Sequence, residues 1–323
     1  MMLENKTILV TGGAGSFGQK FIEAILRDYN PKSVRVYDNR ESAMVEMERK
    51  FKDSRLRFLI GDVRDKDRLY RAVNGVDVLI HAAALKHVPI AEYNPFEAIK
   101  TNVNGTANVI DAAIDNNVEK AILISSDKAV NPVNLYGATK LCAEKLFVQA
   151  NSYAGDRRTR FSCVRYVNVL GSCGSIIPLF LEQKKTGVIT VTHEKMTRFF
   201  MTMEQGIALV VSSLEEMQGG EIFVPRMPSM KIMDLAKVVA PEAQIKIIGI
   251  RPGEKLQEAL LTIEESRHTK ELKDHFIIEP EFTFWDKENI KDGKQLPDGF
   301  YYASDNNTQW FTQDDLKNII EKL

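Results

Sequence analysis

The sequence has few cysteines and no long apolar segment. Only three of its 323 residues are cysteine, and Cys142, Cys163 and Cys173 have neither an even number for pairing nor the spacing of a zinc site. This scarcity excludes a disulfide framework and favours a reducing, cytoplasmic setting, with Cys142 expected to be a small core residue. No run of 18 apolar residues occurs and the first residues lead straight into a strand pattern. We therefore expect neither membrane insertion nor a signal peptide.

An excess of charge of one sign is also missing. The chain has 43 Lys and Arg against 44 Asp and Glu, a net charge of -1. This balance excludes the electrostatic signature of a nucleic-acid or membrane-surface partner. Hydrophobic residues make up 44% and charged residues 27%, an ordinary globular composition, and the length suffices for two domains or one enlarged domain.

The first recognisable pattern is a strand, a glycine turn and a helix. Residues 7–11 form an apolar run that leads directly into GGAGSFG at residues 12–18. Gly12 allows the tight turn, Gly15 lets a pyrophosphate approach backbone N–H groups, and Gly18 lets the helix pack on the strand. By itself this could be a simple strand-to-helix turn, but the context favours a dinucleotide site.

An acidic residue ends the second predicted strand, residues 33–37. Asp38 is placed to accept hydrogen bonds from an adenosine ribose, which favours NAD. Arg40 could instead cover a 2′-phosphate, so NADP stays open, and a plain turn at residues 38–39 is the alternative without a cofactor. The predicted cofactor-binding residues lie in the glycine turn, near strand ends and, for the last two, on a helix predicted to begin near residue 136. They are Gly12, Gly15, Ser16, Phe17, Gly18, Asp38, Arg40, Asp62, Val63, Ala82, Ala83, Ala84, Tyr136 and Lys140.

Strands alternate with helices up to residue 166, including a long helical pattern at residues 92–116. This rhythm predicts an α/β fold, a Rossmann-like doubly wound parallel sheet. From Asn168 the rhythm loosens into a smaller mixed α/β portion, with a hairpin-like segment at residues 186–192. We therefore predict a dinucleotide-binding domain at residues 1–167 and a mainly substrate-binding portion at 168–323, some of whose elements can return to the first domain. His81 lacks companions at metal-ligand spacing, and no metal site is expected.

Two polar pairs lie in the stretch SSDKAVNPVNLYGATKLCAEKLF, residues 125–147. Asp127 and Lys128 stand where a buried strand ends, the edge at which open α/β sheets bind ligands. Tyr136 and Lys140 are four residues apart on a predicted helix and share one face, where the ammonium would stabilise a phenolate. Adjacent charges at a strand end are also often a solvated ion pair, and this is the alternative for Asp127 and Lys128.

The glycine motif and the Tyr136-x-x-x-Lys140 motif together resemble the extended short-chain dehydrogenase/reductase superfamily. The segments HAAALKHVPIAEYNPFEAIKTNVNGT, SDKAVNPVNLYGATK, MTRFF and IRPGEKL are similar to nucleotide-sugar 4,6-dehydratases. They most resemble the UDP-N-acetylglucosamine 4,6-dehydratases that invert C5 and begin pseudaminic-acid and related surface-glycan pathways. The resemblance covers residues 7–261 and implies a lyase. Such enzymes oxidise the sugar C4 hydroxyl by hydride transfer to nicotinamide, remove the C5 proton, expel water from C6 and return the hydride to C6.

The resemblance also implies roles for single residues. Tyr136 would be the base at the C4 hydroxyl, and Lys140 would lower the tyrosine's pKa and hold the nicotinamide ribose. Asp127 would protonate the departing C6 hydroxyl, and Lys128 would remove the C5 proton and take part in its return. The candidate substrate-binding residues are Lys86, Ser126, Asn168, Arg198, Arg251 and Glu254, the arginines as donors to a pyrophosphate and Glu254 as an acceptor for the uridine ribose.

Three segments depart from the family pattern. Residues 38–41 read Asp-Asn-Arg-Glu where the family commonly has Ser-Arg-Asp-Glu, which shifts the prediction to NAD although the resemblance itself favours NADP. Val167 and Cys173 replace a common glycine and arginine, and Gln257 replaces a common histidine. Whether the cofactor is NAD or NADP, the overall reaction involves no net oxidation, so we expect the cofactor to be bound tightly and recycled.

Several alternatives stay open. A C5-retaining dehydratase often has Met at the position of Tyr136, so the tyrosine favours inversion. A GDP-sugar or another nucleotide sugar could be the substrate, and a C4 epimerase would share Tyr136 and Lys140 without needing an acid at Asp127. A non-catalytic dinucleotide-sensing protein typically loses this pair. The resemblance further implies a homo-oligomer, a dimer or larger.

Overall fold

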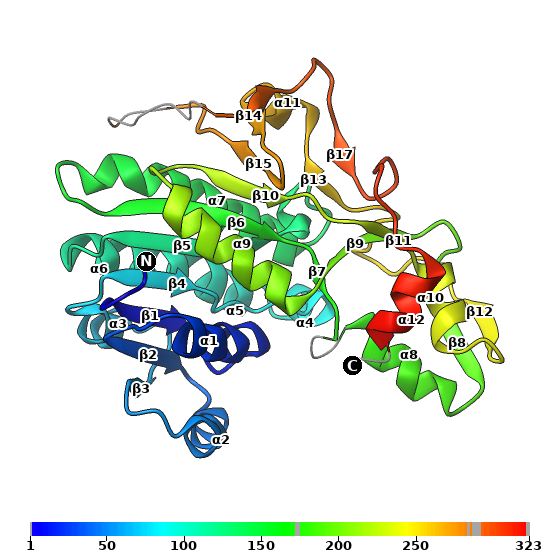
Figure 1. The fold of residues 1–323 in the computed structure, drawn as a ribbon, viewed down its shortest axis with the longest axis horizontal. Helices are drawn as coiled ribbons and strands as arrows, with labels where there is room; N and C mark the ends of the chain where they lie inside the picture. Colours follow the sequence, from blue (N-terminus) through cyan, green and yellow to red (C-terminus); the bar gives the residue numbers. More distant parts are fainter. Residues whose placement is uncertain (1, 172–174, 283–284, 286–291, 321–323) are drawn as a thin grey trace.

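The computed structural model describes residues 2–171, 175–282, 285 and 292–320 (Figure 1). Its main body is a ten-stranded sheet in the order β16-β14-β15-β10-β6-β5-β4-β1-β2-β3. The strands, in chain order, are β1 (Thr7–Thr11), β2 (Ser33–Asp38), β3 (Leu56–Ile60), β4 (Val78–His81), β5 (Lys120–Ser126), β6 (Arg160–Tyr166), β10 (Ile222–Pro225), β14 (Thr269–Glu271), β15 (His275–Ile278) and β16 (Lys294–Gln295). From β3 to β10 the neighbours pair in parallel, and β15, β14 and β16 extend the sheet antiparallel. The predicted Rossmann-like fold class is confirmed.

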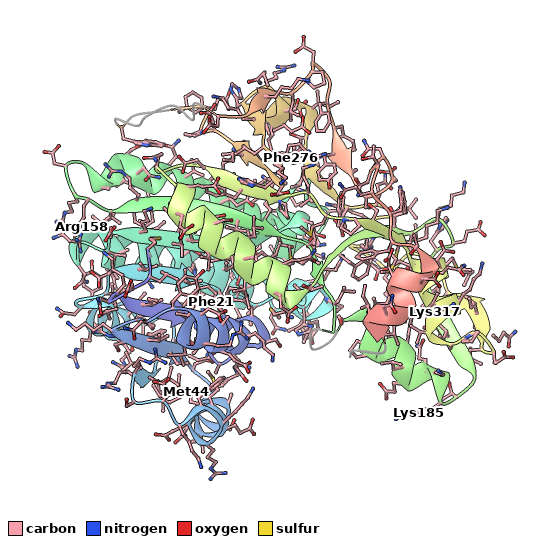
Figure 2. The ribbon with its side chains drawn as sticks, in the orientation of Figure 1. Phe21, Met44, Arg158, Lys185, Phe276 and Lys317 are labelled. Carbon is pink, nitrogen blue, oxygen red and sulfur yellow. The ribbon has the colours of Figure 1, made fainter. Side chains whose placement is uncertain are left out.

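Helices cover both faces of this sheet. Figure 1 shows α1 (Ser16–Asp28) and α9 (Met203–Glu216) side by side on one face. On the other face lie α3 (Lys66–Val73), α6 (Gly105–Asp115) and α7 (Leu135–Ala154), while α2 (Glu41–Phe51) connects β2 and β3. Phe21 of α1 is fully buried against the sheet, whereas Lys185 and Lys317 lie at the periphery of the C-terminal part (Figure 2). The sheet's carboxyl edge, where β1, β4 and β5 end, faces the C-terminal part.

The long helix predicted at residues 92–116 is wrong in its extent and continuity. The segment begins earlier, as α4 (Val88–Tyr93) and α5 (Pro95–Ile99), and passes through a π-helical turn (Lys100–Asn104) before α6. Asn94 leaves the helical region with φ −123° and ψ 62°, because the Pro95 ring restricts the residue before it. In the π-turn the Asn102 side chain accepts a hydrogen bond from the Leu85 N–H and donates one to the Leu85 carbonyl. It also donates to Thr139 Oγ1 of α7. The interruption thus anchors the loop that follows β4.

A smaller part lies beside the sheet's carboxyl edge (Figure 1). Its own apolar core joins α8 (Ile176–Lys184), α10 (Ile232–Val239), α12 (Gln313–Ile320), β8 (Val188–Val191) and β12 (Gln244–Ile247). The hairpin predicted at residues 186–192 is wrong, because β8 pairs in parallel with β12, more than fifty residues away. A three-stranded sheet of β7 (Asn168–Val169), β9 (Thr197–Met201) and β11 (Ser229–Lys231) connects the parts, and β13 (Ala259–Leu261) pairs with β17 (Tyr302–Ala303) above it.

Chain beyond residue 168 therefore also returns to the main body, as α9, β10, β14, β15 and β16. The boundary at residue 167 stays a prediction. Cys142 is exposed on α7 rather than in the core, and Cys163 is buried. Cys173 lies outside the described residues. No helix in the described part of the chain is long and apolar enough to cross a bilayer.

Candidate active site

Three adjoining cavities follow the carboxyl edge of the sheet. The first, here the cofactor cavity, has a volume of about 530 Å³ and runs from the glycine turn to the loop after β4. It shares Ser16, Phe17 and Lys86 with the central cavity, of about 340 Å³. The central cavity in turn shares Asn168 and Ser175 with the C-terminal cavity, of about 250 Å³. The three cavities therefore adjoin one another along this edge of the sheet.

The glycine turn is shaped for a ligand's phosphates. Gly12 has φ +66°, and a Cβ there would lie 2.8 Å from the backbone nitrogen of Ala83. At Gly18 a Cβ would lie 2.5 Å from the Gly13 carbonyl oxygen. Side chains at either position would clash, so the turn brings bare backbone against α1's first turn, where N–H groups lack helical partners. The residues present therefore fit a dinucleotide cofactor.

The cofactor cavity collects the residues predicted for it from the strand ends. It is lined by Gly12, Gly15, Ser16, Phe17, Gly18, Asp38, Arg40, Asp62, Val63, Ala82, Ala83 and Ala84. Tyr136 and Lys140, predicted to contact both cofactor and sugar, line the central cavity instead.

Asp38 and Arg40 form an ion pair at the end of β2. Arg40 Nε and Nη2 donate to the two carboxylate oxygens of Asp38 at 3.0 and 2.9 Å, and Ala14 N–H donates at 3.1 Å. The Asp38 side chain is 4% exposed and that of Arg40 53%. The aspartate thus ties the glycine turn to β2, while the guanidinium of Arg40 is about half exposed to solvent.

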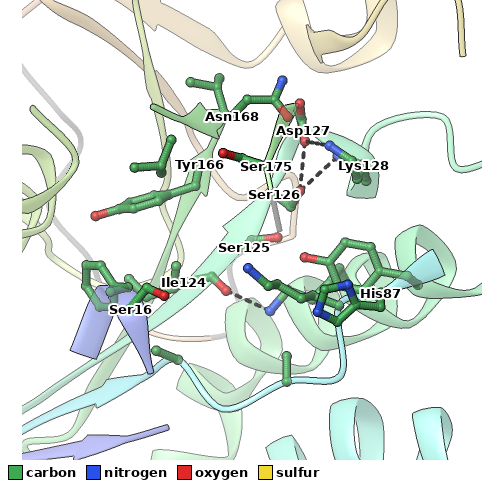
Figure 3. Close-up of a pocket in the computed structure, with 18 of the residues that line it drawn as sticks. Ser16, His87, Ile124, Ser125, Ser126, Asp127, Lys128, Tyr166, Asn168 and Ser175 are labelled. Atoms are coloured by element: carbon green, nitrogen blue, oxygen red, sulfur yellow. Dashed lines mark hydrogen bonds and ion pairs between the residues drawn. The ribbon is translucent and has the colours of Figure 1, made fainter. Parts of the chain in front are cut away.

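The end of β5 gives the central cavity its charged pair. Asp127 and Lys128 begin a short 3₁₀ turn (Asp127–Ala129) that Ser126 caps. Asp127 Oδ1 accepts from Ser126 Oγ at 2.8 Å and from Lys128 Nζ at 2.9 Å (Figure 3). Asp127 is 1% exposed, and its Oδ2 has no hydrogen-bond partner among the described residues. A buried carboxylate oxygen left without a donor is costly unless a ligand supplies one.

Lys128 lies between two carboxylates. Its ammonium is 2.9 Å from Asp127 Oδ1 and 3.8 Å from Oε1 of Glu258, and its side chain is 26% exposed. Burial opposes the charge on Lys128, but Asp127 and Glu258 outweigh that effect and raise the lysine's pKa above its ordinary value. In the unliganded protein the lysine is therefore an ammonium.

Tyr136 and Lys140 lie on the first turns of α7, which Asn134 caps by accepting from Gly137 N–H. Burial raises the pKa of Tyr136, while Lys128 and a side-chain hydrogen bond with Ser126 lower it. The cation that acts on the phenol is thus Lys128, whereas the sequence assigned this effect to Lys140. Lys140 Nζ donates to the Ile124 carbonyl at 2.7 Å, the hydrogen bond drawn at Ile124 in Figure 3. Burial lowers the pKa of Lys140 to about 8.

The predicted substrate residues divide between cavities. Lys86, Ser126 and Asn168 line the central cavity, and Asn168, Arg198, Arg251 and Glu254 line the C-terminal cavity. Arg251 is 54% exposed and can reach a ligand. Arg198 is different, because its side chain is 12% exposed and its Nη1 and Nη2 donate to the carbonyls of Thr197, Leu256 and Lys255. Arg198 holds the 251–258 loop in place, which leaves it few donors for a phosphate.

Some residues that line the cavities were not predicted from the sequence. Ser125 lines the central cavity with a buried hydroxyl that has no hydrogen-bond partner in the described chain, and Asn39 and Gly61 line the cofactor cavity. Their position at strand ends was a usable signal. Tyr166, the last residue of β6, carried the same signal. By contrast, nothing local indicated His87, Ser175 or the apolar lining of the C-terminal cavity, such as Phe180 and Phe200. No cluster of three or more His, Cys, Asp or Glu side chains suited to a metal occurs among the residues described.

Comparison with known proteins gives concordant results. Residues 8–280 match the family described as polysaccharide biosynthesis protein. A UDP-N-acetylglucosamine 4,6-dehydratase (inverting) of Campylobacter jejuni is 48% identical over 99% of this chain and 98% of its own length. A UDP-glucose 4-epimerase of Rickettsia conorii is 40% identical over 86% of this chain and 84% of its own. The X-ray structure of Pen from Bacillus thuringiensis superposes with a TM-score of 0.91, at 39% identity over 100% of both chains.

Proposed function

The chain belongs to the polysaccharide biosynthesis protein family, and on this premise we propose that it is an inverting UDP-N-acetylglucosamine 4,6-dehydratase. The enzyme is a hydro-lyase that converts the sugar to a 4-keto-6-deoxy product with inversion at C5. The observation that carries this proposal is the Asp127–Lys128 pair beside Tyr136 in one cavity. An elimination needs an acid and a base in addition to the group that oxidises C4, and this cavity has all three.

The oxidising half is Tyr136, Lys140 and the bound dinucleotide. A bound nicotinamide dinucleotide would supply the hydride acceptor that oxidation of C4 requires and the hydride donor that C6 requires. Tyr136 takes the proton of the C4 hydroxyl, and the Lys128 ammonium and Ser126 favour the phenolate that does so. Lys140, held at the Ile124 carbonyl, binds the nicotinamide ribose, and the turn at residues 12–18 binds the pyrophosphate.

The eliminating half is Asp127 and Lys128. The proton on Lys128 Nζ passes along the 2.9 Å hydrogen bond to Asp127 Oδ1, which leaves a neutral amine and a carboxylic acid. Lys128 then removes the C5 proton, made acidic by the C4 ketone, and Asp127 protonates the C6 hydroxyl, which departs as water. The ion pair is thereby restored. Inversion follows when the proton returning to C5 arrives on the opposite face, a return in which Lys128 takes part.

NAD is the proposed cofactor. Asp38, which ends β2 at the cofactor cavity, would repel a 2′-phosphate and can accept from the ribose hydroxyls once Arg40 turns away. Arg40 is the feature that favours NADP, because its half-exposed guanidinium could pair with that phosphate. Mass spectrometry of the cofactor released from the denatured protein decides between them, and NADP would overturn this assignment.

The nucleotide end of the substrate is assigned to the C-terminal cavity. Arg251 pairs with the pyrophosphate, and Glu254, 3.7 Å from Arg251 in an ion pair, accepts from the uridine ribose. Lys86 and Asn168 bind the sugar side. Arg198 acts in this proposal by supporting the 251–258 loop.

Incubation of the purified protein with UDP-N-acetylglucosamine tests the proposed function. We expect the nucleotide sugar to lose one water by mass spectrometry, and proton NMR in D₂O to show the C5-inverted 4-keto product. A C5-retained product would exclude inversion. Interconversion with the C4 epimer without loss of water would instead support an epimerase, the activity named for the Rickettsia relative.

We also propose a cytoplasmic homo-oligomer. Cys142 and Cys163 are free thiols, in keeping with a reducing compartment. Tyr93 on α4 and Phe96 on α5 are 88% and 75% exposed, and such aromatic side chains are typical of surfaces that a second copy covers. Sedimentation velocity would contradict the oligomer if it returned only the mass of one chain.

A further inference from the structure

Glu258 lies immediately before β13 and is a buried carboxylate among three cations. Its side chain is 4% exposed. Its Oε1 is 3.8 Å from both Lys128 Nζ and Arg198 Nε, and its Oε2 is 3.3 Å from Lys255 Nζ. It does not line any of the three cavities and so stands behind Lys128, away from the substrate space.

We propose that Glu258 is a positioning residue for the elimination: its carboxylate holds Lys128 in place and stabilises the ammonium that Lys128 forms when it takes the C5 proton. This role rests on the proposed function of Lys128. The sequence drew attention to Arg251 and Glu254 in the same segment as substrate contacts, and gave Glu258 no role.

The backbone of Glu258 is fixed independently of the substrate. Its N–H donates to Ser304 Oγ at 3.0 Å, and its carbonyl accepts from Ser304 N–H at 2.8 Å. Ser304 Oγ also bonds Thr197 Oγ1 at 2.8 Å, which ties the residue to β9. Because this backbone is fixed and the carboxylate is buried among three cations, Glu258 provides a fixed charge, as a site that stabilises a developing ammonium requires.

The charges around Lys128 show why the second carboxylate matters. Asp127 and Glu258 face the ammonium as anions, Arg198 opposes it as a cation, and the Tyr136 phenol lies on its cavity side. Around Glu258 itself are Lys128, Lys255, Arg198 and, further away, the Tyr301 phenol. Once Asp127 has accepted a proton it is neutral. Glu258 is then the anion that remains within 4 Å of Lys128 among the described residues.

Two variants that change this balance in opposite directions give the test. Glu258→Gln keeps the side chain's shape and removes the charge, so the pKa of Lys128 should fall by about one unit or more. Lys255→Gln removes the cation that competes for Glu258, so the pKa of Lys128 should rise. If Glu258 were needed only for folding, the two substitutions would not move the pKa of Lys128 in opposite directions.

Trace acetylation with acetic anhydride at about pH 8 reads the fraction of neutral Lys128 by mass spectrometry, without substrate, with the exposed Lys185 as internal reference. We expect the Lys128-to-Lys185 ratio to rise at least about threefold in Glu258→Gln and to fall in Lys255→Gln. Equal ratios in wild type and Glu258→Gln, or ratios that move together in both variants, would overturn the proposal. If Glu258→Gln does not fold, the decrease in Lys255→Gln still decides.

Turnover supplies the second readout. In Glu258→Gln, loss of water from UDP-N-acetylglucosamine should slow about ten- to a hundredfold, while the initial rise in reduced nicotinamide absorbance persists, and Glu258→Asp should recover part of the rate. An unslowed elimination would refute the positioning role. If the wild-type protein forms no dehydrated product, the proposed function fails, and the acetylation ratios still report whether Glu258 controls Lys128.

Discussion

Replacement of Asp127 by asparagine should stop the elimination and spare the oxidation. The amide has the volume of the carboxylate, and its oxygen can still accept from Ser126 Oγ and Lys128 Nζ, now 2.8 and 2.9 Å from Asp127 Oδ1. It cannot deliver a proton to the C6 hydroxyl. A positioned general acid contributes roughly 10²- to 10⁴-fold, so we expect turnover to fall by that factor, about 3 to 5 kcal/mol of barrier. Loss of one of the two anions beside Lys128 places the effect in the upper half of the range.

Two measurements separate the half-reactions. Mass spectrometry follows loss of water under steady-state conditions, and nicotinamide absorbance after a single addition of substrate follows oxidation of C4. In Asp127→Asn the absorbance should rise and then persist, because the 4-keto sugar cannot proceed. Asp115→Asn, the same exchange at a half-exposed surface position, is the matched control. Turnover within about threefold of wild type would refute the assignment of Asp127 as the acid.

Three further variants test other parts of the site and the core beneath it. Tyr136→Phe should lower turnover at least about a hundredfold and, unlike Asp127→Asn, should abolish the rise in reduced nicotinamide. Arg40→Gln frees Asp38 from its ion pair, so calorimetry should show NAD affinity kept within about tenfold. Tight NADP binding by the wild-type protein that weakens more than NAD binding in this variant would indicate that Arg40 binds a 2′-phosphate. Burial lowers the pKa of His81 to about 3, so the folded state keeps it neutral while the unfolded state takes up a proton near pH 6.5. Stability is therefore lost as the pH falls below 6.5, by about 2 kcal/mol at pH 5. Urea unfolding at pH 7 and pH 5 should show that His81→Asn lacks this loss, and equal pH dependence in both proteins would contradict it.

The cofactor cavity was largely predictable because its determinants are local. A parallel strand ends where its apolar run ends, and the next residues, such as Asp38, Asp62 and Ala82, must reach the same edge of the sheet. The twelve positions predicted from the glycine turn and the strand ends accordingly line one cavity. Helical periodicity was less reliable between β4 and α6, where the apolar pattern continues through Pro95 although the backbone cannot.

Interactions between distant segments could not be inferred in this way. Helical spacing puts Tyr136 and Lys140 on one face, but it says nothing of what the end of β5 brings to the phenol, and there Lys128 and Ser126 act. Arg198 was read as a free cation because the sequence does not show which carbonyls it will meet. Glu258 follows Lys128 by 130 positions, and it depends on the pairing of β13 with β17.

One lysine links the two halves of the proposed reaction. As an ammonium, Lys128 lowers the pKa of Tyr136 and so favours removal of the C4 hydroxyl proton. As a neutral amine, it is the base that removes the C5 proton. Oxidation and elimination therefore make opposite demands on the same nitrogen, and transfer of its proton to Asp127 Oδ1, 2.9 Å away, changes the site from one state to the other. The charge on Lys128 therefore sets the order of the steps. If Lys128 lost its proton before C4 was oxidised, the Tyr136 phenolate would lose the cation that favours it, and the C5 proton would not yet be acidic.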